Sequence, residues 1–234
     1  MKDTESSGGK VFGRFTEPAH QVLDLAREEA GRFGHRYLGT EHVLLGMLTE
    51  GQSRAAQLLR SHGVEVTTAR AALARLADRG VVPGPRPSDA ELLGSLGIDL
   101  DAVRRDTEQA FGVRAVGEAT WRVTRRGWRD RRMIWTPLCG PPLFAKRALQ
   151  LASDQAHALG HGHVGPEHLL LGVLEDAGQP AERERGSRRH RRIAAHVGLP
   201  DGYQGAAGLL LAALEIDVDR LHDAALVELG GIRR

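Results

Sequence analysis

The sequence is poor in cysteine, in aromatic residues and in long apolar runs. Cys139 is the only cysteine of the 234-residue chain, so no internal disulfide can form, which fits a reducing compartment. No apolar stretch approaches the roughly 20 residues that a membrane-spanning helix needs. The first residues also lack the apolar segment of a signal peptide. We therefore expect a cytoplasmic protein with a flexible lead over residues 1–11.

Aromatic residues make up only 4% of the chain, whereas 41% of all residues are hydrophobic. A core of this composition consists mainly of leucine, alanine and valine, and leucine with alanine favours helices over strands. No segment shows the alternation of polar and apolar residues that is typical of a half-buried strand. The composition therefore predicts an all-α fold in one or two compact domains.

A motif rich in glycine, histidine and leucine occurs twice. Residues 34–48 and 160–174 match in register, and the similarity extends backward to Leu23 and Leu149. Such a long internal match indicates a duplicated structural unit. We expect a pseudo-symmetric double repeat of short helices. The first repeat unit is then expected at residues 12–112 and the second at residues 143–234. A connector over residues 113–142 joins them.

Capping residues and glycine stops predict the helix boundaries. Thr16 is the expected N-cap of the first helix, with Pro18 in its first turn and Gly34 after its end, and Thr40 is the expected N-cap of the second. In the first repeat unit, the expected helices cover residues 17–33, 41 to near 51, 53–62, 67–79, 88–95 and 100–111. In the second, they cover residues 143–159, 166–175, 189–197, 203–213 and 218–229.

Three segments carry a resemblance to a known family: residues 12–17, 26–30 and 39–46. Their sequences are Phe-Gly-Arg-Phe-Thr-Glu, Ala-Arg-Glu-Glu-Ala and Gly-Thr-Glu-His-Val-Leu-Leu-Gly. They closely resemble the N-terminal domain of the Clp ATPases, above all of the ClpC type, and the resemblance covers residues 12–79 and 143–175. It implies a helical domain that captures substrates and adaptors for an ATP-driven unfoldase ring coupled to a protease.

The phosphate-binding loop of an ATPase is missing, because the sequence contains no Gly-x-x-x-x-Gly-Lys-Ser/Thr motif. The residue patterns of nucleophilic catalysis are missing as well. We therefore expect a stand-alone, non-catalytic binding protein that needs no cofactor. Three roles stay open at this point: an adaptor for a Clp machine, a decoy that shields it, and a scavenger of Clp-directed antibiotics.

The resemblance implies binding sites at the starts of two equivalent helices. In the ClpC type, the glutamate of the repeated box is implicated in recognising phosphorylated arginine, and the matching positions are Glu41 and Glu167. A carboxylate can hold a guanidinium while helix-start N–H groups and a nearby cation hold the phosphate. The structural alternative is an acid that only complements the helix dipole. Pro166 lacks the hydroxyl and N–H of Thr40, so the first half is the preferred binding half.

Two phenylalanines precede the first helix. In mycobacterial relatives, cyclic peptide antibiotics engage this general surface, so the resemblance extends the candidate site to Phe12 and Phe15. Alternatively, a phenylalanine before a capped helix staples that helix to the core. Because Pro141 stands at the position that aligns with Phe15, we expect any such pocket to be asymmetric.

Five histidines lie in the repeated motif: His35, His42, His161, His163 and His168. Three imidazoles in the second half could bind a metal, but no cysteine, acidic cluster or His-Glu-x-x-His pattern completes a site. We expect no metal. Instead, we expect His35 and His161 to bond carbonyl groups at helix ends.

The connector offers an alternative function. Residues 114–132 are rich in arginine, and Trp121, Trp128 and Trp135 follow at intervals of seven. Arginines interleaved with aromatic residues can stack on bases, so nucleic-acid binding is the rival hypothesis. No helix-turn-helix, zinc or single-strand-binding signature accompanies them, and such segments are commonly solvated connectors or docking sites. An affinity that falls steeply with salt would identify this alternative.

Overall fold

The computed structural model describes residues 15–84, 94–112, 144–178, 194–195, 199, 203 and 205–230. Within these residues all regular elements are helices, and Phe15 and Val164 form an isolated bridge. No helix in the described part is long and apolar enough to cross a membrane. The all-α prediction from the composition is confirmed.

The chain divides into two compact units, which we describe separately. One consists of Met1–Gly84 together with Leu143–Arg234, and the other of Pro85–Pro142. Both copies of the repeated motif therefore lie in the first unit. The helix pair expected at residues 88–111 belongs to the second unit, although the sequence places it in the first repeat unit.

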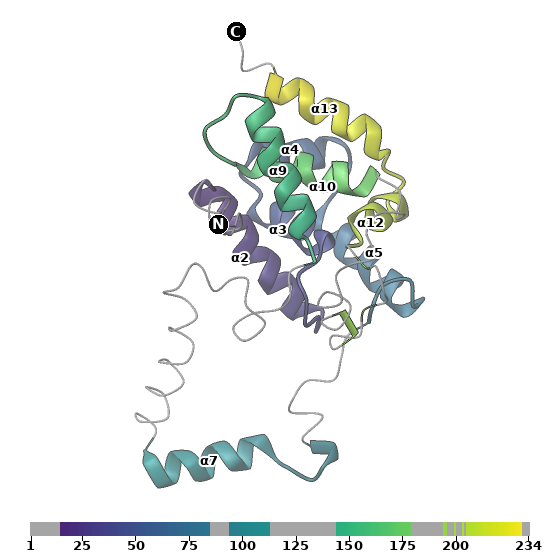
Figure 1. Cartoon of the computed structure of the whole chain (residues 1–234). Coiled ribbons are helices and arrows are strands. Elements are labelled where there is room, and N and C mark those ends of the chain that lie inside the picture. The colour runs from purple at the N-terminus through teal and green to yellow at the C-terminus, as the bar shows by residue number, and fades with distance from the viewer. Residues whose placement is uncertain are drawn as a thin grey trace, which may run out of the picture. The chain divides into compact units, whose positions relative to one another are not determined.

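The first unit contains two series of helices in the same order (Figure 1). The first series consists of α2 (Glu17–Arg32), α3 (Thr40–Glu50), α4 (Arg54–Ser61) and α5 (Val66–Asp78). The second series consists of α9 (Lys146–Ala158), α10 (Pro166–Gly178), α12 (Ala207–Ala213) and α13 (Val218–Gly230). The helix α2 packs on α3, and α9 packs on α10. The helices α3 and α10 contact each other, and each contacts the third helix of the other series, so the predicted double repeat is confirmed as two interlocked halves.

Local signals explain most helix boundaries. The Thr16 hydroxyl accepts the Ala19 N–H at 3.3 Å and caps α2, as predicted. The predicted start of α3 is late by one residue, because its N-cap is Gly39 and Thr40 is already helical. The predictions for α9 and α12 also begin too early, since these helices start at Lys146 and Ala207.

The second unit contains α7 (Leu100–Phe111). A carboxylate oxygen of Asp99 accepts the N–H groups of Asp101 and Ala102 at 2.9 and 3.1 Å, so Asp99 is the N-cap of this helix. Most of the helices expected at residues 88–95 and 189–197 lies outside the described residues.

Two glycines determine how closely the paired helices approach. A Cβ atom added at Gly46 of α3 would collide with the Val22 carbonyl oxygen of α2. A Cβ atom added at Gly172 of α10 would collide with the Ala148 carbonyl oxygen of α9. Because the obstacles are backbone atoms, a side chain at either position must push the two helices apart.

The substitution Gly46→Ala is expected to lower the free energy of unfolding by about 1–3 kcal/mol, because the two helices must separate. Gly31→Ala is the matched control, since its added Cβ atom would meet nothing within 4 Å. Alanine in a helix is about 0.5–1 kcal/mol more favourable than glycine, so this control should be neutral or stabilising. Urea unfolding followed by circular dichroism measures both variants, and equal stabilities would contradict the close approach of α2 and α3.

Candidate functional site

Each copy of the repeated motif begins a helix with the same hydrogen bonds. In the first half, the Gly39 N–H donates to Nδ1 of His42 at 3.0 Å, and Nε2 of His42 lies 2.8 Å from Nδ1 of His35. The same two contacts at the same distances join the equivalent residues of the second half: Gly165, His168 and His161. The two helix starts are thus equivalent in geometry as well as in sequence.

The backbone determines which nitrogen of His42 carries the proton. Because Nδ1 accepts the Gly39 N–H, a neutral His42 is protonated on Nε2 and donates to His35. The histidine pair therefore joins the start of α3 to the segment that follows α2. The expectation that His35 bonds a helix-end carbonyl is corrected, because the nearest partner of its Nδ1 is another imidazole.

Burial keeps these imidazoles neutral. His42 is 0% exposed and His168 is 3% exposed. Burial lowers the pKa of each to about 4, and it also lowers the pKa of His35. At neutral pH His35, His42 and His168 are therefore hydrogen-bonding groups that carry no charge.

His35, Glu41 and His42 place one possible ligand atom each within 4.8 Å of one another. The sequence draws attention to a different trio of histidines, in the second half. Both nitrogens of His42 and Nδ1 of His35 already take part in hydrogen bonds. A metal ion could bind these nitrogens only by breaking their hydrogen bonds. We therefore still expect no metal at this cluster.

Glu41 and Thr40 are covered by residues of the second half. Glu41 is 0% exposed. The Tyr203 hydroxyl donates to its Oε1 at 2.8 Å, and the Ala206 N–H donates to its Oε2 at 2.8 Å. The Thr40 hydroxyl oxygen accepts the Ala207 N–H at 3.2 Å. The candidate residues that the sequence favoured are therefore already bonded within the chain.

Aromatic rings line the space around Glu41. Tyr37 and Tyr203, the two tyrosines of the chain, lie with their rings 5.4 Å apart and their hydroxyl oxygens 3.3 Å apart. Phe144 lies 6.0 and 6.1 Å from these two rings. Burial and the Glu41 charge raise the pKa of both tyrosines, so their hydroxyls stay protonated and Tyr203 remains a donor.

The phenylalanine candidates lie in different surroundings. Phe15 is buried, and its backbone pairs with Val164 of the other half, an arrangement that favours core packing over ligand contact. Phe12 and Pro141 lie outside the described residues. Phe144 makes the corresponding link in the second half, because its N–H donates to the Leu38 carbonyl at 2.8 Å.

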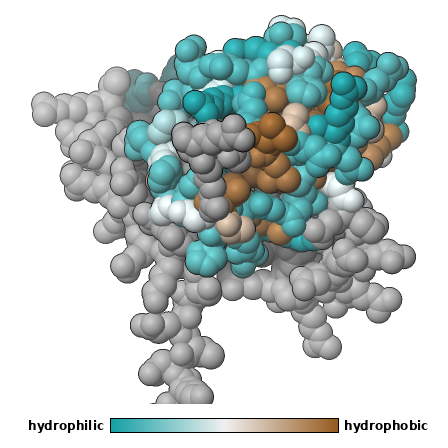
Figure 2. Space-filling view, turned by 90° about the horizontal axis from the view of Figure 1, so that it is seen from above, coloured by the Kyte–Doolittle hydropathy of each residue, from teal (hydrophilic) through white to brown (hydrophobic). Residues whose placement is uncertain are grey.

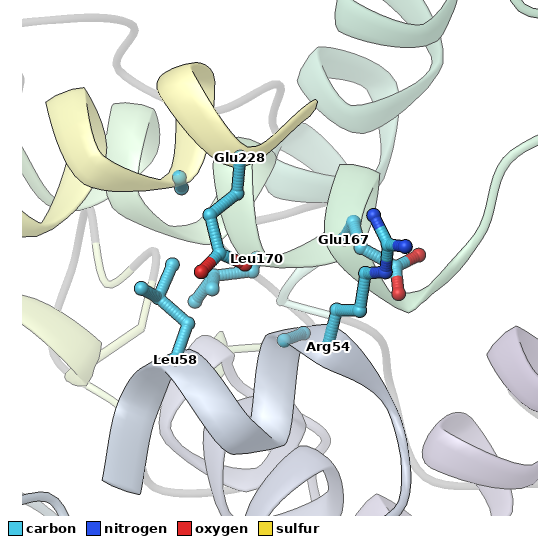
Figure 3. Close-up of a pocket in the computed structure, with 7 residues that line it drawn as sticks. Arg54, Leu58, Glu167, Leu170 and Glu228 are labelled. Carbon is cyan, nitrogen blue, oxygen red and sulfur yellow. The ribbon is translucent and has the colours of Figure 1, made fainter. Parts of the chain in front are cut away.

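Glu167 occupies the equivalent position of α10 but is only partly buried. It lines an open hollow together with Arg54, Ala55, Leu58, Leu170, Ala225 and Glu228. The labelled side chains of this hollow come from α4, α10 and α13 (Figure 3). Arg54 and Glu167 lie at one side of it, and the Glu228 carboxylate points toward the apolar side chains. The sequence predicted Glu167 but gave no signal for Arg54 or Glu228.

The hollow lies among helices that also expose apolar side chains. The view from the α13 side shows apolar residues gathered in the middle of the face and hydrophilic residues around them (Figure 2). Val227 of α13 is 74% exposed, and Leu209 of α12 is 46% exposed. A protein segment bound to this face would bury part of this apolar surface.

A glycine stands two residues before each glutamate because the carboxylate folds back over it. A Cβ atom at Gly39 would collide with the Glu41 carboxylate, and one at Gly165 would lie 2.8 Å from Oε2 of Glu167. Both carboxylates thus sit against the first turn of their own helix. From there each one can meet groups of the opposite half.

The two halves differ in how their third helix is capped. In α4, the Ser53 hydroxyl accepts the Ala56 N–H at 3.2 Å. The N-cap of α12 is Ala206, whose side chain cannot accept a hydrogen bond. The first N–H groups of α12 instead donate to Glu41 and Thr40. The first glutamate therefore serves as the missing cap of α12, whereas α4 caps itself and leaves Glu167 at the hollow.

Comparison with known proteins adds three findings. Residues 14–92 match the family model for the Clp repeat (R) N-terminal domain. The chain is 32% identical over 174 residues to the chaperone protein ClpB of Oceanobacillus iheyensis and to the negative regulator of genetic competence ClpC/MecB of Bacillus subtilis. Each of these alignments covers 74% of this chain but only 15% of the relative.

One solved structure has a similar fold over nearly the whole chain. The N-terminal domain of the chaperone ClpD from Arabidopsis thaliana superposes with a TM-score of 0.51 and 18% sequence identity. The match covers 94% of this chain and 97% of that domain. The helical double repeat is therefore a fold that is already known in a solved protein.

Proposed function

Because the chain carries a Clp N-terminal domain, we propose that it binds proteins or peptides that contain phosphorylated arginine. A Clp N-terminal domain is a binding domain and not a catalytic one. The proposed receptor is the hollow at Glu167. In this proposal the chain binds its ligand and catalyses no reaction.

The side chains of the hollow match the parts of a phosphoarginine. Glu167 and Glu228 supply carboxylates for the guanidinium group, and Arg54 supplies a cation for the phosphoryl group. Leu58 and Leu170 offer apolar surface to the methylene groups of the ligand. The observation that supports the proposal most directly is that one cation and two carboxylates lie around apolar side chains, at a glutamate of the repeated motif.

The proposal moves the preferred site from the first half to the second. Thr40 and Glu41 are bonded to the chain itself, whereas Glu167 is partly exposed. Pro166 cannot offer an N–H to a phosphate, as the sequence indicates. At the Glu167 hollow, Arg54 of α4 supplies the positive charge for the phosphate instead.

Titration calorimetry with phosphoarginine, arginine and inorganic phosphate tests the receptor. We expect phosphoarginine to bind more tightly than the other two, because only it engages both charges. The variants Glu167→Gln and Arg54→Met should each weaken binding by roughly 10- to 100-fold, since a hydrogen bond to a charged group contributes about 1.5–3 kcal/mol.

Two exposed residues outside the hollow serve as matched controls: Glu28→Gln in α2 and Arg75→Met in α5. Both controls should bind phosphoarginine like the wild type. A wild type that gives no heat with phosphoarginine, or an affinity that survives Glu167→Gln, would show that the receptor is misplaced.

Three cellular roles use the same binding chemistry, and one further experiment separates them. An adaptor must bind a ClpC-type unfoldase ring, so it should co-sediment with the ring. A decoy or a scavenger of Clp-directed cyclic peptide antibiotics should capture its ligand without binding the ring. Sedimentation of the chain with a purified ring, with and without such a peptide, therefore assigns the role.

A further inference from the structure

The Glu41 site holds a segment of the chain in the way that it would hold a ligand. A guanidinium binds a carboxylate with two donors, one to each oxygen. The Tyr203 hydroxyl and the Ala206 N–H reproduce this pattern, one on Oε1 and one on Oε2, each at 2.8 Å. With the Ala207 N–H on Thr40, both polar side chains at this helix start are occupied.

The segment reaches this position because of a difference between the two halves. Residues 51–53 join α3 to α4, whereas residues 179–206 join α10 to α12. The longer connection brings Tyr203 next to Tyr37 and Phe144. It therefore carries the residues that close the first site, and the short connection of the first half has none.

Gly205 allows the close approach of this segment. Its φ is +137°, a conformation that side chains rarely adopt. A Cβ atom at this position would collide with the Thr40 hydroxyl and would lie 2.9 Å from the Thr40 backbone nitrogen. Any larger residue at position 205 must therefore lift the segment away from Thr40.

We propose that Tyr203 and residues 205–207, which we call the latch, are an intramolecular occupant that closes a second phosphoarginine site at Glu41. The chain then has one open receptor, at Glu167, and one closed receptor that becomes available when the latch detaches. This inference rests on the proposed function and concerns the regulation of the equivalent site in the first half.

The number of phosphoarginine molecules bound per chain tests the latch. Equilibrium dialysis with the full chain should give one ligand for the wild type and two for the double variant Tyr203→Phe/Gly205→Ala. Adding Glu41→Gln to the double variant should return the number to one. Gly84→Ala, whose Cβ atom would meet nothing within 4 Å, is the control and should stay at one.

Amide hydrogen exchange provides a readout that needs no ligand. Tyr203→Phe keeps the ring that packs against Tyr37 and Phe144 but removes one donor to Glu41, so the variant should stay folded. Exchange of the Ala206 and Ala207 amides should become roughly 10-fold faster in this variant, because the latch loses a hydrogen bond to a charged group. Unchanged exchange at these two amides would overturn the latch.

The outcomes separate the latch from the proposed function. One ligand in both wild type and double variant overturns the latch and leaves the Glu167 receptor intact. Two ligands in the wild type also overturn the latch, since the Glu41 site would then be open. No ligand in the wild type, but one in the double variant that depends on Glu41, supports the latch and overturns the Glu167 receptor. No binding in any variant overturns both.

Discussion

Acidification is expected to destabilise the fold by several kcal/mol before most carboxylates titrate. The cause lies in His42 and His168, whose pKa is about 4 in the folded chain against 6.5 for an unperturbed imidazole. Between these two values the unfolded chain binds a proton at each position and the folded chain does not. The histidine contribution is therefore fully present above about pH 6.5 and is lost as the pH falls toward about 4.

The size of the effect follows from the pKa difference. One unit corresponds to about 1.4 kcal/mol, so each histidine can remove up to about 3 kcal/mol over this window. Protonation also needs a hydrogen on Nδ1, which must then give up the N–H of Gly39 or Gly165. We therefore expect loss of stability and loss of the helix starts to occur together.

Urea unfolding at a series of pH values measures this prediction. In the wild type the free energy of unfolding should fall steadily below about pH 6.5. In His168→Gln the slope should be smaller, because one group no longer takes up a proton on unfolding. His157→Gln changes an exposed histidine of α9 and should keep the wild-type slope. A flat profile for the wild type between about pH 7 and pH 5 would show that the imidazoles are not held neutral.

Removing the guanidinium of Arg70 is the second change with a large expected effect. Glu29 of α2 is 1% exposed, and Arg70 of α5 donates to its two oxygens at 2.9 and 2.6 Å. Thr49 of α3 also donates to Glu29 at 3.4 Å. The carboxylate thus joins three helices of the first half, and Arg70 balances its buried charge.

Arg70→Met should lower the free energy of unfolding by up to about 3–5 kcal/mol, because it removes two charged hydrogen bonds from a buried carboxylate. In the described part of the chain, only Arg32, whose Nε lies 3.6 Å from Oε2 of Glu29, then remains as a cation beside it. The double variant Glu29→Gln/Arg70→Met should regain much of this loss, since no charge then remains buried. Arg27→Met is the control, because its partner Asp24 is exposed and such pairs contribute only about 0–1 kcal/mol. Equal losses for Arg70→Met and Arg27→Met would refute the buried pair.

In the described part of the second half, the positions equivalent to Glu29 and Thr49 carry no such ion pair, although Arg147 of α9 lies 3.4 Å from Asp176 of α10. Gln155 stands at the position of Glu29 and Glu175 at that of Thr49, and the Gln155 amide donates to Glu175 at 2.8 Å. Both halves therefore have a polar contact between the paired helices at these positions. The carboxylate lies on the first helix of the pair in one half and on the second helix in the other. We expect the stability of the first half to depend more strongly on a single residue, Arg70, than the stability of the second half depends on any one residue of this link.

The sequence predicts the features that depend on neighbouring residues or on the repeat. Thr16 and Asp99 cap their helices because a capping side chain needs only the next few residues. The two helix series follow from the repeated motif itself. The predicted helix boundaries are wrong where tertiary contacts determine the start of a helix. An example is α12, whose first turn is capped by α3 and not by its own N-cap residue.

Whether each candidate glutamate is bonded within the chain or accessible to a ligand could not be predicted in the same way. Tyr203 lies 162 residues from Glu41, and no periodic pattern relates them. One signal was available, because Ser53 caps α4 whereas Ala206 stands at the start of α12. A helix without a capping side chain needs an acceptor from elsewhere, and Glu41 is that acceptor.

In the proposed function Glu167, and not Glu41, receives the ligand. Amide chemical shifts of the ¹⁵N-labelled wild type during titration with phosphoarginine test this directly. We expect the amides of Arg54, Ala55 and Glu167 to shift, while those of Thr40 and Glu41 stay unchanged. Shifts centred on Thr40 and Glu41, or no shifts at all, would contradict it.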